Sequence, residues 1–437
     1  MKSLHMSKRF ISFISCFLTA AHFFAQTPGT IADSTLRLDY TFSGNTNETI
    51  IALHEARTIP GWYGRNVNTD TLLLRGNGRI VMRDAVTDSI CYCQSFSTLY
   101  QEWLTTEEAT RTTRAFENVF LLPMPRNAVV IELELNNFKG GTLATLRHSI
   151  DPRDILIRPA GTGPLPPHRY LLYSDRPERA IDIAIVAEGY TADEMEAFYA
   201  HARTAMDALM AHEPFKTLRD RFNVVAVATP SAESGVSIPH KGLWKQTAVH
   251  SHFDTFYSER YLTTLHLGEL HDWLAGIPYE HIIILANTDN YGGGGIFNSY
   301  TLTTARHASF EPVVVHEFGH SFAGLADEYF YDDQYEEFYY PDIEPWEQNI
   351  TTLCDFSTKW EDLLPRKCVL PRKDRTNVSD GETETVGLYE GAGYQSRGVY
   401  RPCWNCRMRT NEAPVFCFVC RRAIDRLIRY YTEALPR

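Results

Sequence analysis

His316-Glu317-Phe318-Gly319-His320 has the form H-E-x-x-H, in which two potential metal ligands and one carboxylate fall within five residues. If this segment is helical, the two histidines lie one turn apart on the same face. Both imidazoles can then reach a single zinc ion, and Glu317 can reach water bound to that ion. The segment therefore predicts a catalytic Zn²⁺ site, in which Glu317 is the general base.

The residues around this segment fit a helix over 309–325 that ends close to its second histidine. Ser309 can cap the start, and Pro312 falls in the first turn, where its missing N–H costs nothing. Gly324 follows His320 by four residues, at a position where a helix can end in a left-handed turn. A helix that ends there can return the following residues to the metal.

The third metal ligand is expected among the residues that follow this turn. The metzincin pattern, H-E-x-x-H-x-x-G-x-x-H, places a third histidine after a glycine turn. In this chain the glycine and the next potential ligand come one residue later, and that ligand is a carboxylate. Zinc readily accepts an aspartate oxygen, so we predict His316, His320 and Asp327 as the metal ligands, with Glu328 as the alternative to Asp327.

The first 25 residues have the pattern of a secretory signal peptide. Three basic residues precede an apolar run over 10–24, which is short and polar for a membrane span, and a membrane anchor is the alternative interpretation. Removal of residues 1–25 moves the net charge from −12 to −15, which argues against nucleic acid as a partner. We therefore expect a secreted, periplasmic or cell-surface protein with no stable transmembrane span, and the sequence does not indicate its oligomeric state.

Two further features could bind cations. Cys403-x2-Cys406 and Cys417-x2-Cys420 are separated by ten residues, a spacing that suits a second, structural Zn²⁺. Export favours two disulfides for these four cysteines instead. The acidic stretch over 332–344 could bind Ca²⁺, although a solvated loop beside the cleft is the favoured interpretation.

The chain divides into two regions with different patterns. After the signal, residues 26–158 contain short segments in which apolar and polar residues alternate, as at 36–42 and 129–135. This predicts an antiparallel β-sandwich. Residues 159–167 are rich in Pro and Gly and are expected to be a linker.

The second region, residues 168–437, predicts an α/β domain. Continuous apolar runs at 181–186, 223–228 and 281–286 are typical of strands that are covered on both faces. Helical patterns alternate with these runs, so we expect a mainly parallel, twisted sheet with crossover helices. The expected fold class is thus α+β with two domains, a β-sandwich followed by a metzincin-like catalytic domain.

The segment HEFGHSFAGLADEY, residues 316–329, resembles the IgA metallopeptidase family, a group of metzincin-like secreted bacterial zinc endopeptidases. Residues 35–40, 96–103 and 116–118 are similar to the amino-terminal domain of that family, and 187–190 to the start of its catalytic domain. The resemblance implies one catalytic zinc and cleavage of internal bonds in a protein or peptide substrate. It does not imply that the substrate is an immunoglobulin.

Two other segments have a role in this family architecture. Cys406-Arg407-Met408-Arg409 resembles the methionine turn, in which Met408 would support the histidines by packing; the alternative is an ordinary core methionine. Residues 290–297 contain four consecutive glycines just before the predicted helix. They could form an edge strand that pairs with a substrate backbone, or a mobile surface loop.

Three functions are compatible with these observations. The leading hypothesis is a secreted zinc endopeptidase. A non-catalytic surface protein that binds protein or glycan would have no need of Glu317, and its presence argues against that hypothesis. A zinc amidase or exopeptidase is the third, and the length of the chain and the possible edge strand favour an open cleft and internal cleavage.

Overall fold

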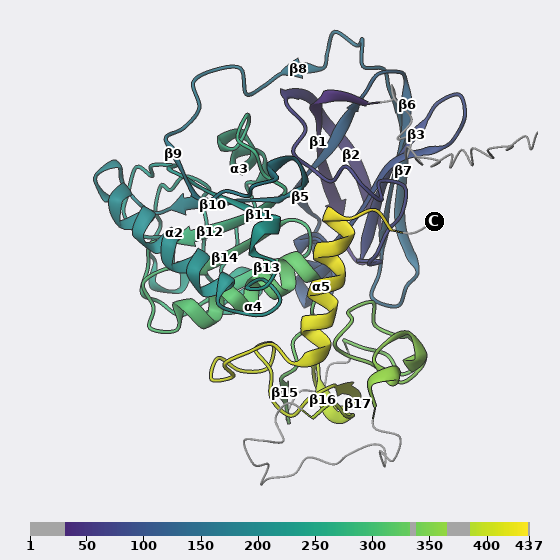
Figure 1. The fold of residues 1–437 in the computed structure, drawn as a ribbon, viewed down its shortest axis with the longest axis vertical. Coiled ribbons are helices and arrows are strands. Elements are labelled where there is room, and N and C mark those ends of the chain that lie inside the picture. The colour runs from purple at the N-terminus through teal and green to yellow at the C-terminus, as the bar shows by residue number, and fades with distance from the viewer. Residues whose placement is uncertain (1–30, 333–337, 365–384, 436–437) are drawn as a thin grey trace, which may run out of the picture.

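The computed structural model describes residues 31–332, 338–364 and 385–435, and its ribbon is drawn in Figure 1. The predicted signal peptide lies outside the described residues. Within those ranges, no helix combines the length and the apolar character that are needed to cross a membrane.

The amino-terminal region is built mostly of strands, as expected. They form two four-stranded sheets, ordered β5-β1-β2-β8 and β4-β3-β6-β7, in which every pairing except that of β2 with β8 is antiparallel. Alternate residues of both sheets, such as Leu38 and Ile131, share one apolar core. The strands are β1 (Ile31–Gly44), β2 (Thr49–Pro60), β3 (Gly78–Asp84), β4 (Ile90–Phe96), β5 (Arg114–Pro125), β6 (Val129–Asn136), β7 (Thr142–Ile150) and β8 (Arg158–Pro159).

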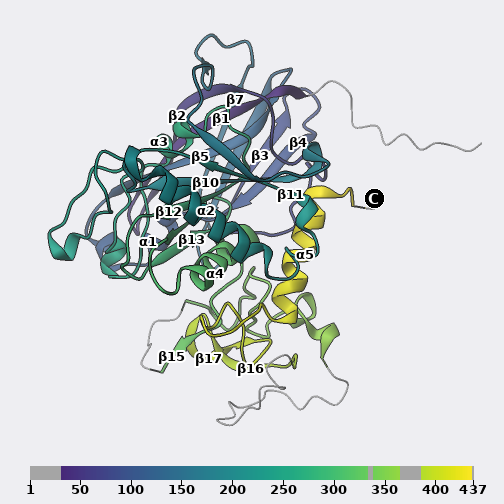
Figure 2. The same cartoon turned by 60° about the vertical axis from the view of Figure 1, so that its left-hand side comes forward.

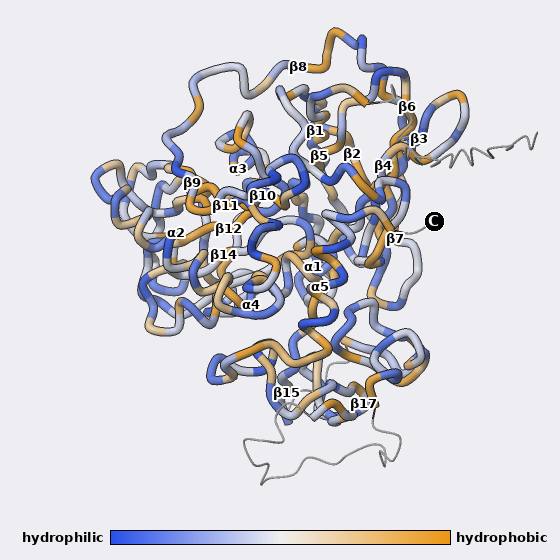
Figure 3. Tube along the Cα trace, in the orientation of Figure 1, coloured by the Kyte–Doolittle hydropathy of each residue, from blue (hydrophilic) through white to orange (hydrophobic). Residues whose placement is uncertain are grey.

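The second region contains a six-stranded sheet with the order β13-β14-β12-β10-β11-β9. Its four central strands are parallel, and the two edge strands, β9 and β13, are antiparallel to their neighbours. The three predicted apolar runs lie in β10, β11 and β12, and Figure 3 shows hydrophobic residues gathered in this sheet. The strands are β9 (His168–Leu172), β10 (Ile181–Glu188), β11 (Phe222–Val227), β12 (His281–Ala286), β13 (Gly293–Ile296) and β14 (Tyr300–Thr304).

The two faces of this sheet are covered by different parts of the chain. On one face, β10 residues such as Ile183 and Ile185 pack with α2 (Met195–Met210), α4 (Phe310–Ala323) and α5 (Phe418–Thr432). On the other face, residues such as Ala184 and Val186 share a core with the amino-terminal sheets. The strands are buried on both sides, as predicted, but the second face is covered mainly by the amino-terminal sheets, together with the short helices around Leu99 and Leu270.

A buried arginine joins the amino-terminal region to a helix of the second region. Arg37 of β1 is fully buried and forms an ion pair with Asp39 at 2.7 Å. Its other nitrogens donate to Asp272 at 2.5 Å and to the carbonyl of Gly268 at 2.9 Å, both in α3 (Leu267–Trp273). Burial of this charge is tolerated because carboxylate and carbonyl oxygens surround it.

A small three-stranded sheet, β15-β17-β16, lies beyond α4 and near the amino-terminal end of α5, and Figures 1 and 2 show it at one end of the molecule. It consists of β15 (Phe330–Tyr331), β16 (Tyr389–Ala392) and β17 (Tyr394–Arg401). Because β15 begins directly after the segment 325–329, its pairing with β17 helps to fix the chain that leaves the H-E-x-x-H helix.

Candidate metal centre

The H-E-x-x-H segment lies on α4, and the predicted helix is confirmed. Ser309 occupies the position before the first turn, but its side chain makes no capping hydrogen bond, contrary to expectation. Gly324 ends the helix with φ +56°, and its N–H donates to the carbonyl of His320 at 2.9 Å. A left-handed residue at this point is readily adopted by glycine, and it reverses the direction of the chain.

The reversal brings Asp327 against the two histidines. Asp327 Oδ1 lies 3.0 Å from Nε2 of His316 and 3.2 Å from Nε2 of His320, and the two Nε2 atoms are 3.1 Å apart. Three ligands bound tetrahedrally to zinc at about 2.0–2.1 Å would be separated by about 3.3 Å. The three atoms therefore surround a space of the size that one metal ion occupies.

The hydrogen bonds around the histidines direct their lone pairs into this space. Nδ1 of His316 lies 3.0 Å from the carbonyl oxygen of Arg407, and Nδ1 of His320 lies 2.5 Å from that of Leu325. A carbonyl can only accept, so both Nδ1 atoms must carry hydrogen. In the neutral imidazoles, both Nε2 atoms then present lone pairs toward Asp327 Oδ1, which has no hydrogen-bond partner of its own among the described residues.

Asp327 is also held from its second oxygen. The hydroxyl of Tyr394, the first residue of β17, donates to Asp327 Oδ2 at 2.5 Å. The backbone of the same hairpin contributes as well, because the N–H of Gly393 donates to the Asp327 carbonyl at 2.9 Å. These contacts turn Oδ1 toward the histidines.

The charges of this site change the pKa values of its members. Burial lowers the pKa of His320, but the Asp327 carboxylate outweighs burial and raises that pKa to about 9. Burial acts to raise the pKa of Asp327, but the charge of His320 outweighs it and holds that pKa well below its usual range. The metal-free site therefore favours a proton on an imidazole, and a metal cation must displace that proton.

Glu317 lies between the two histidines in the sequence of α4 and packs against β13. A Cβ atom at Gly293 would lie 2.8 Å from Glu317 Oε1. Burial raises the pKa of Glu317, while the charges of His316 and His320 partly oppose the rise. A raised pKa makes the Glu317 carboxylate a stronger base, which favours general-base chemistry.

Glu328, the alternative third ligand, faces a different group of residues. Its Oε1 accepts a hydrogen bond from Asn349 Nδ2 at 3.0 Å and lies 3.1 Å from Cys420 Sγ. The structure thus brings Asp327 together with His316 and His320, and it brings Glu328 together with cysteines.

Met408 packs beneath α4 at the position between the two histidines. It is fully buried, and a Cβ at Gly319 would lie 2.7 Å from its Sδ. Its carbonyl accepts from the N–H of Glu328 at 2.8 Å. This is the packing contact that we expected of Met408.

Residues 293–296 of the glycine segment form β13, the edge strand of the sheet, which runs along α4. Part of its outer edge is already occupied. The N–H of Leu262 donates to the Gly293 carbonyl, and the N–H of Gly293 donates to the Arg260 carbonyl, both at 3.3 Å. Any further strand that pairs with β13 must therefore do so beyond Gly293.

Gly295→Ala is expected to destabilise the protein, because β13 approaches α4 too closely for a side chain. The added Cβ would lie 2.3 Å from the Glu317 carbonyl oxygen and 2.9 Å from the His320 Cβ. Relief of this clash should cost about 1–3 kcal/mol and lower the unfolding temperature. At Gly163 a Cβ would have no atom within 4 Å, so Gly163→Ala is the matched control. Equal unfolding temperatures for the two variants would contradict the close packing.

Glu102 brings the amino-terminal region close to the metal centre. It lies on α1 (Leu99–Trp103), and its Oε2 accepts a hydrogen bond from the Tyr261 hydroxyl at 2.5 Å. Burial raises the pKa of Glu102 to about 7, and the Tyr261 hydrogen bond and the charge of His320 partly oppose the rise. Glu102 is thus close enough to the site to respond to its charge.

Glu102→Gln should make the stability of the protein less dependent on pH. The folded-state pKa of Glu102 is raised from 4.5 to about 7. The contribution of Glu102 to the free energy of unfolding is therefore fully present below pH 4.5 and is lost as the pH rises through 7. Gln has no charge, so the variant should gain relative stability across this window, by at most about 3 kcal/mol. Unfolding temperatures at about pH 5 and about pH 8 test this. The exposed Glu107 provides the control, and an equal pH response of Glu107→Gln would contradict the assignment.

The four cysteines near the carboxyl end do not form the expected disulfides. Cys403, Cys406, Cys417 and Cys420 are buried free thiols. The acidic stretch is only partly described. Within the described part, Glu344 accepts from the N–H of Asp355 at 3.0 Å, and the stretch supplies no residue to a group of three or more potential metal ligands.

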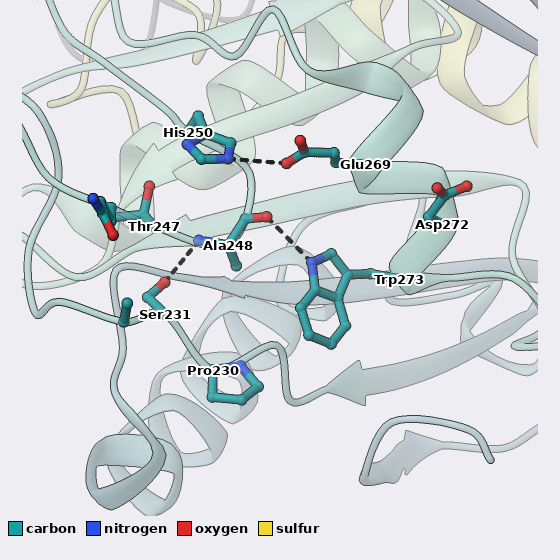
Figure 4. Close-up of a pocket in the computed structure, with 10 residues that line it drawn as sticks. Pro230, Ser231, Thr247, Ala248, His250, Glu269, Asp272 and Trp273 are labelled. Carbon is teal, nitrogen blue, oxygen red and sulfur yellow. Dashed lines mark hydrogen bonds and ion pairs between the residues drawn. The ribbon is translucent and has the colours of Figure 1, made fainter.

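A separate concave region of about 580 Å³ is lined by residues of the segment between β11 and β12. Figure 4 shows His250 facing Glu269 there, with His250 Nε2 and Glu269 Oε2 3.0 Å apart. The residues that line it include none of the predicted zinc site.

Comparison with known families identifies the class of this protein. A family model described as IgA Peptidase M64 matches residues 171–379 and 372–428, which include α4 and the residues around Met408. A second model, described as Peptidase M64 N-terminus, matches residues 29–146. The chain belongs to the M64 peptidase family. No curated protein matches it by sequence.

Membership of M64 confirms the resemblance that was based on residues 316–329 and on the amino-terminal segments. M64 is a metallopeptidase family, so the chain is classed as a hydrolase that acts on protein or peptide substrates. The group formed by His316, His320 and Asp327 is a candidate for the metal site of such an enzyme.

Two residues that support the candidate site of this M64 protein were not found from the sequence. Tyr394 lies 67 positions after Asp327, and Arg407 lies 91 positions after His316. Both act through long-range contacts, and no local pattern marks either of them. Tyr329, which follows Glu328 directly, lies beside Tyr394, with the two ring centres 5.4 Å apart.

Proposed function

We propose that this protein is a secreted zinc endopeptidase, in which His316, His320 and Asp327 bind the metal and Glu317 is the general base. The observation that carries the proposal is the convergence of three lone-pair atoms at 3.0–3.2 Å in a buried site. Without a metal, a proton on one imidazole has to offset the repulsion among these lone pairs. Nitrogen and oxygen donors in this arrangement suit zinc, and three protein ligands leave a fourth position open, as in catalytic sites.

A bound zinc would polarise the carbonyl of the peptide bond and lower the pKa of water to about 7. Glu317 then accepts a proton from the attacking water and delivers it to the leaving amine. Its burial against β13 supports this role, because burial raises its pKa and makes the carboxylate a stronger base. Arg260 is close enough to interact electrostatically with Glu317 and is a candidate donor for the developing negative charge.

The position of β13 supports cleavage of internal bonds. An extended peptide can add to the edge of a sheet through backbone hydrogen bonds. Glycines at 293–295 allow β13 to run directly over Glu317 and His320, so a peptide paired along this edge would pass the metal centre. A site that accepts a passing chain does not require a free terminus of the substrate.

The export of the enzyme is part of this proposal. It rests on the basic residues and the apolar run at 1–25. Determination of the amino-terminal residue of the protein recovered from its native host tests it. A mature chain that begins near residue 26 is expected, and an intact amino terminus would contradict export.

The proposed activity is tested by digestion of a peptide library with blocked termini. Cleavage at internal bonds is expected, with loss of activity after treatment with a chelator and recovery on addition of Zn²⁺. Cleavage confined to libraries with free termini would indicate an exopeptidase. Absence of cleavage by the zinc-loaded protein would favour a binding protein and overturn the proposal.

A further inference from the structure

A second cluster of potential metal ligands lies next to the candidate metal centre. The side chains of Glu328, Cys406, Cys417 and Cys420 each offer one ligand atom, and these atoms all lie within 4.8 Å of one another. None of the four residues is more than 2% exposed. Cys406 belongs to the loop that carries Met408, and the last two cysteines lie at the start of α5. Three separate parts of the chain therefore meet at this cluster.

The sulfur positions fit a shared metal ion and not a disulfide. Sγ of Cys406 and Sγ of Cys420 are 3.7 Å apart. A disulfide requires about 2.05 Å, whereas two thiolates bound tetrahedrally to zinc at about 2.3 Å lie about 3.8 Å apart. In addition, the N–H of Cys417 donates to Cys406 Sγ at 3.2 Å, a bond that would stabilise a thiolate at that position.

The carboxylate of Glu328 provides an independent indication of a cation. Its Oε1 is satisfied by Asn349, but its fully buried Oε2 has no hydrogen-bond partner among the described residues. A buried carboxylate oxygen without a partner is destabilising. A cation bound by Glu328 and the cysteines would remove this cost.

We propose that Glu328, Cys406, Cys417 and Cys420 bind a second, structural Zn²⁺. Three thiolates and one carboxylate are a ligand set that zinc accepts, and soft sulfur ligands disfavour Mg²⁺ and Ca²⁺. Four protein ligands leave no open position, so the role of this ion is structural. Cys403 is also buried, but it is not one of the residues whose ligand atoms all lie within 4.8 Å of one another.

This ion would hold two parts of the candidate catalytic centre in place. Glu328 directly follows Asp327, so its coordination would restrain the third catalytic ligand. Cys406 directly precedes Arg407, whose carbonyl accepts from Nδ1 of His316. The structural site would thus support the catalytic site through the backbone, while taking no part in the reaction.

Metal content tests this proposal without measuring activity. The wild-type protein is loaded with zinc under reducing conditions and desalted. It should then contain two zinc ions per chain, as measured by inductively coupled plasma mass spectrometry. Glu328→Gln and Cys420→Ser should each contain one. Cys93→Ser is the matched control, because Cys93 is a buried free thiol outside the cluster, and it should contain two. Asp327→Ala should also contain one, since it removes a ligand of the other site.

A variant of the cluster can fail to fold, so a second measurement uses the intact cluster. Asp327→Ala loaded with Co²⁺ should retain the absorption caused by sulfur-to-cobalt charge transfer. Loss of that absorption, or wild-type protein with a single zinc ion and two disulfides by mass spectrometry, would overturn the second site. Loss of one zinc in Cys403→Ser, with both retained in Glu328→Gln, would overturn the proposed ligand set in favour of four thiolates. None of these outcomes depends on peptide hydrolysis.

Discussion

Glu317→Gln is expected to lower kcat/KM for peptide hydrolysis by a factor of about 10²–10⁴ while metal binding is retained. Gln has nearly the shape of Glu, so it preserves the packing of α4 against Gly293. It cannot accept a proton from water at neutral pH, so the base is lost. The measurements are kcat/KM with one fluorogenic peptide taken from the library, and the zinc content of the same sample.

Glu311→Gln is the matched control for this prediction. Glu311 lies in the first turn of the same helix and is exposed, so its replacement makes the same chemical change away from the metal centre. We expect its kcat/KM to stay close to that of the wild type. Equal activity of Glu317→Gln and the wild type would remove Glu317 from the mechanism.

The candidate catalytic site could be predicted largely because its main residues are local in sequence. His316 and His320 are fixed by a single helical turn, and Gly324 marks the end of that helix. The spacing then limited the third ligand to two adjacent carboxylates. Only the tertiary contacts of Tyr394 and Asn349 separate Asp327 from Glu328, and such contacts are not encoded in any local pattern.

The sequence-based predictions that were wrong or incomplete concern residues whose packing partners are distant in the sequence. The apolar run at 181–186 predicts a strand buried on both faces, but it cannot specify that the sandwich region covers one of them. The expectation of disulfides rested on the compartment inferred for the chain, and not on geometry. Two pairs of cysteines, each separated by two residues, are compatible with disulfides and with metal binding. The 3.7 Å distance between Sγ of Cys406 and Sγ of Cys420 distinguishes the two interpretations, because it is too long for a disulfide.

Asp327→Ala is expected to cause the largest loss of zinc affinity at the catalytic site. It removes one of three ligands and leaves two histidines, whose Nδ1 atoms remain bonded to carbonyls. Tyr394→Phe keeps the ligand but removes the hydrogen bond to its second oxygen. Loss of such a supporting partner typically lowers metal affinity by about 10–100-fold. We therefore expect both variants to be impaired, with Asp327→Ala affected more strongly.

The double variant, which combines Asp327→Ala with Tyr394→Phe, shows whether Tyr394 acts through Asp327. If the hydroxyl serves only to orient the Asp327 carboxylate, then Tyr394→Phe should have no further effect once Asp327 is alanine, and the two effects should not be additive. Competition with a chelator of known affinity gives the zinc dissociation constants of the four proteins, and the exposed Tyr257→Phe is the control for the loss of a tyrosine hydroxyl. Additive losses would mean that Tyr394 supports the fold independently of the metal. Unchanged affinity in Asp327→Ala would exclude Asp327 as the third ligand.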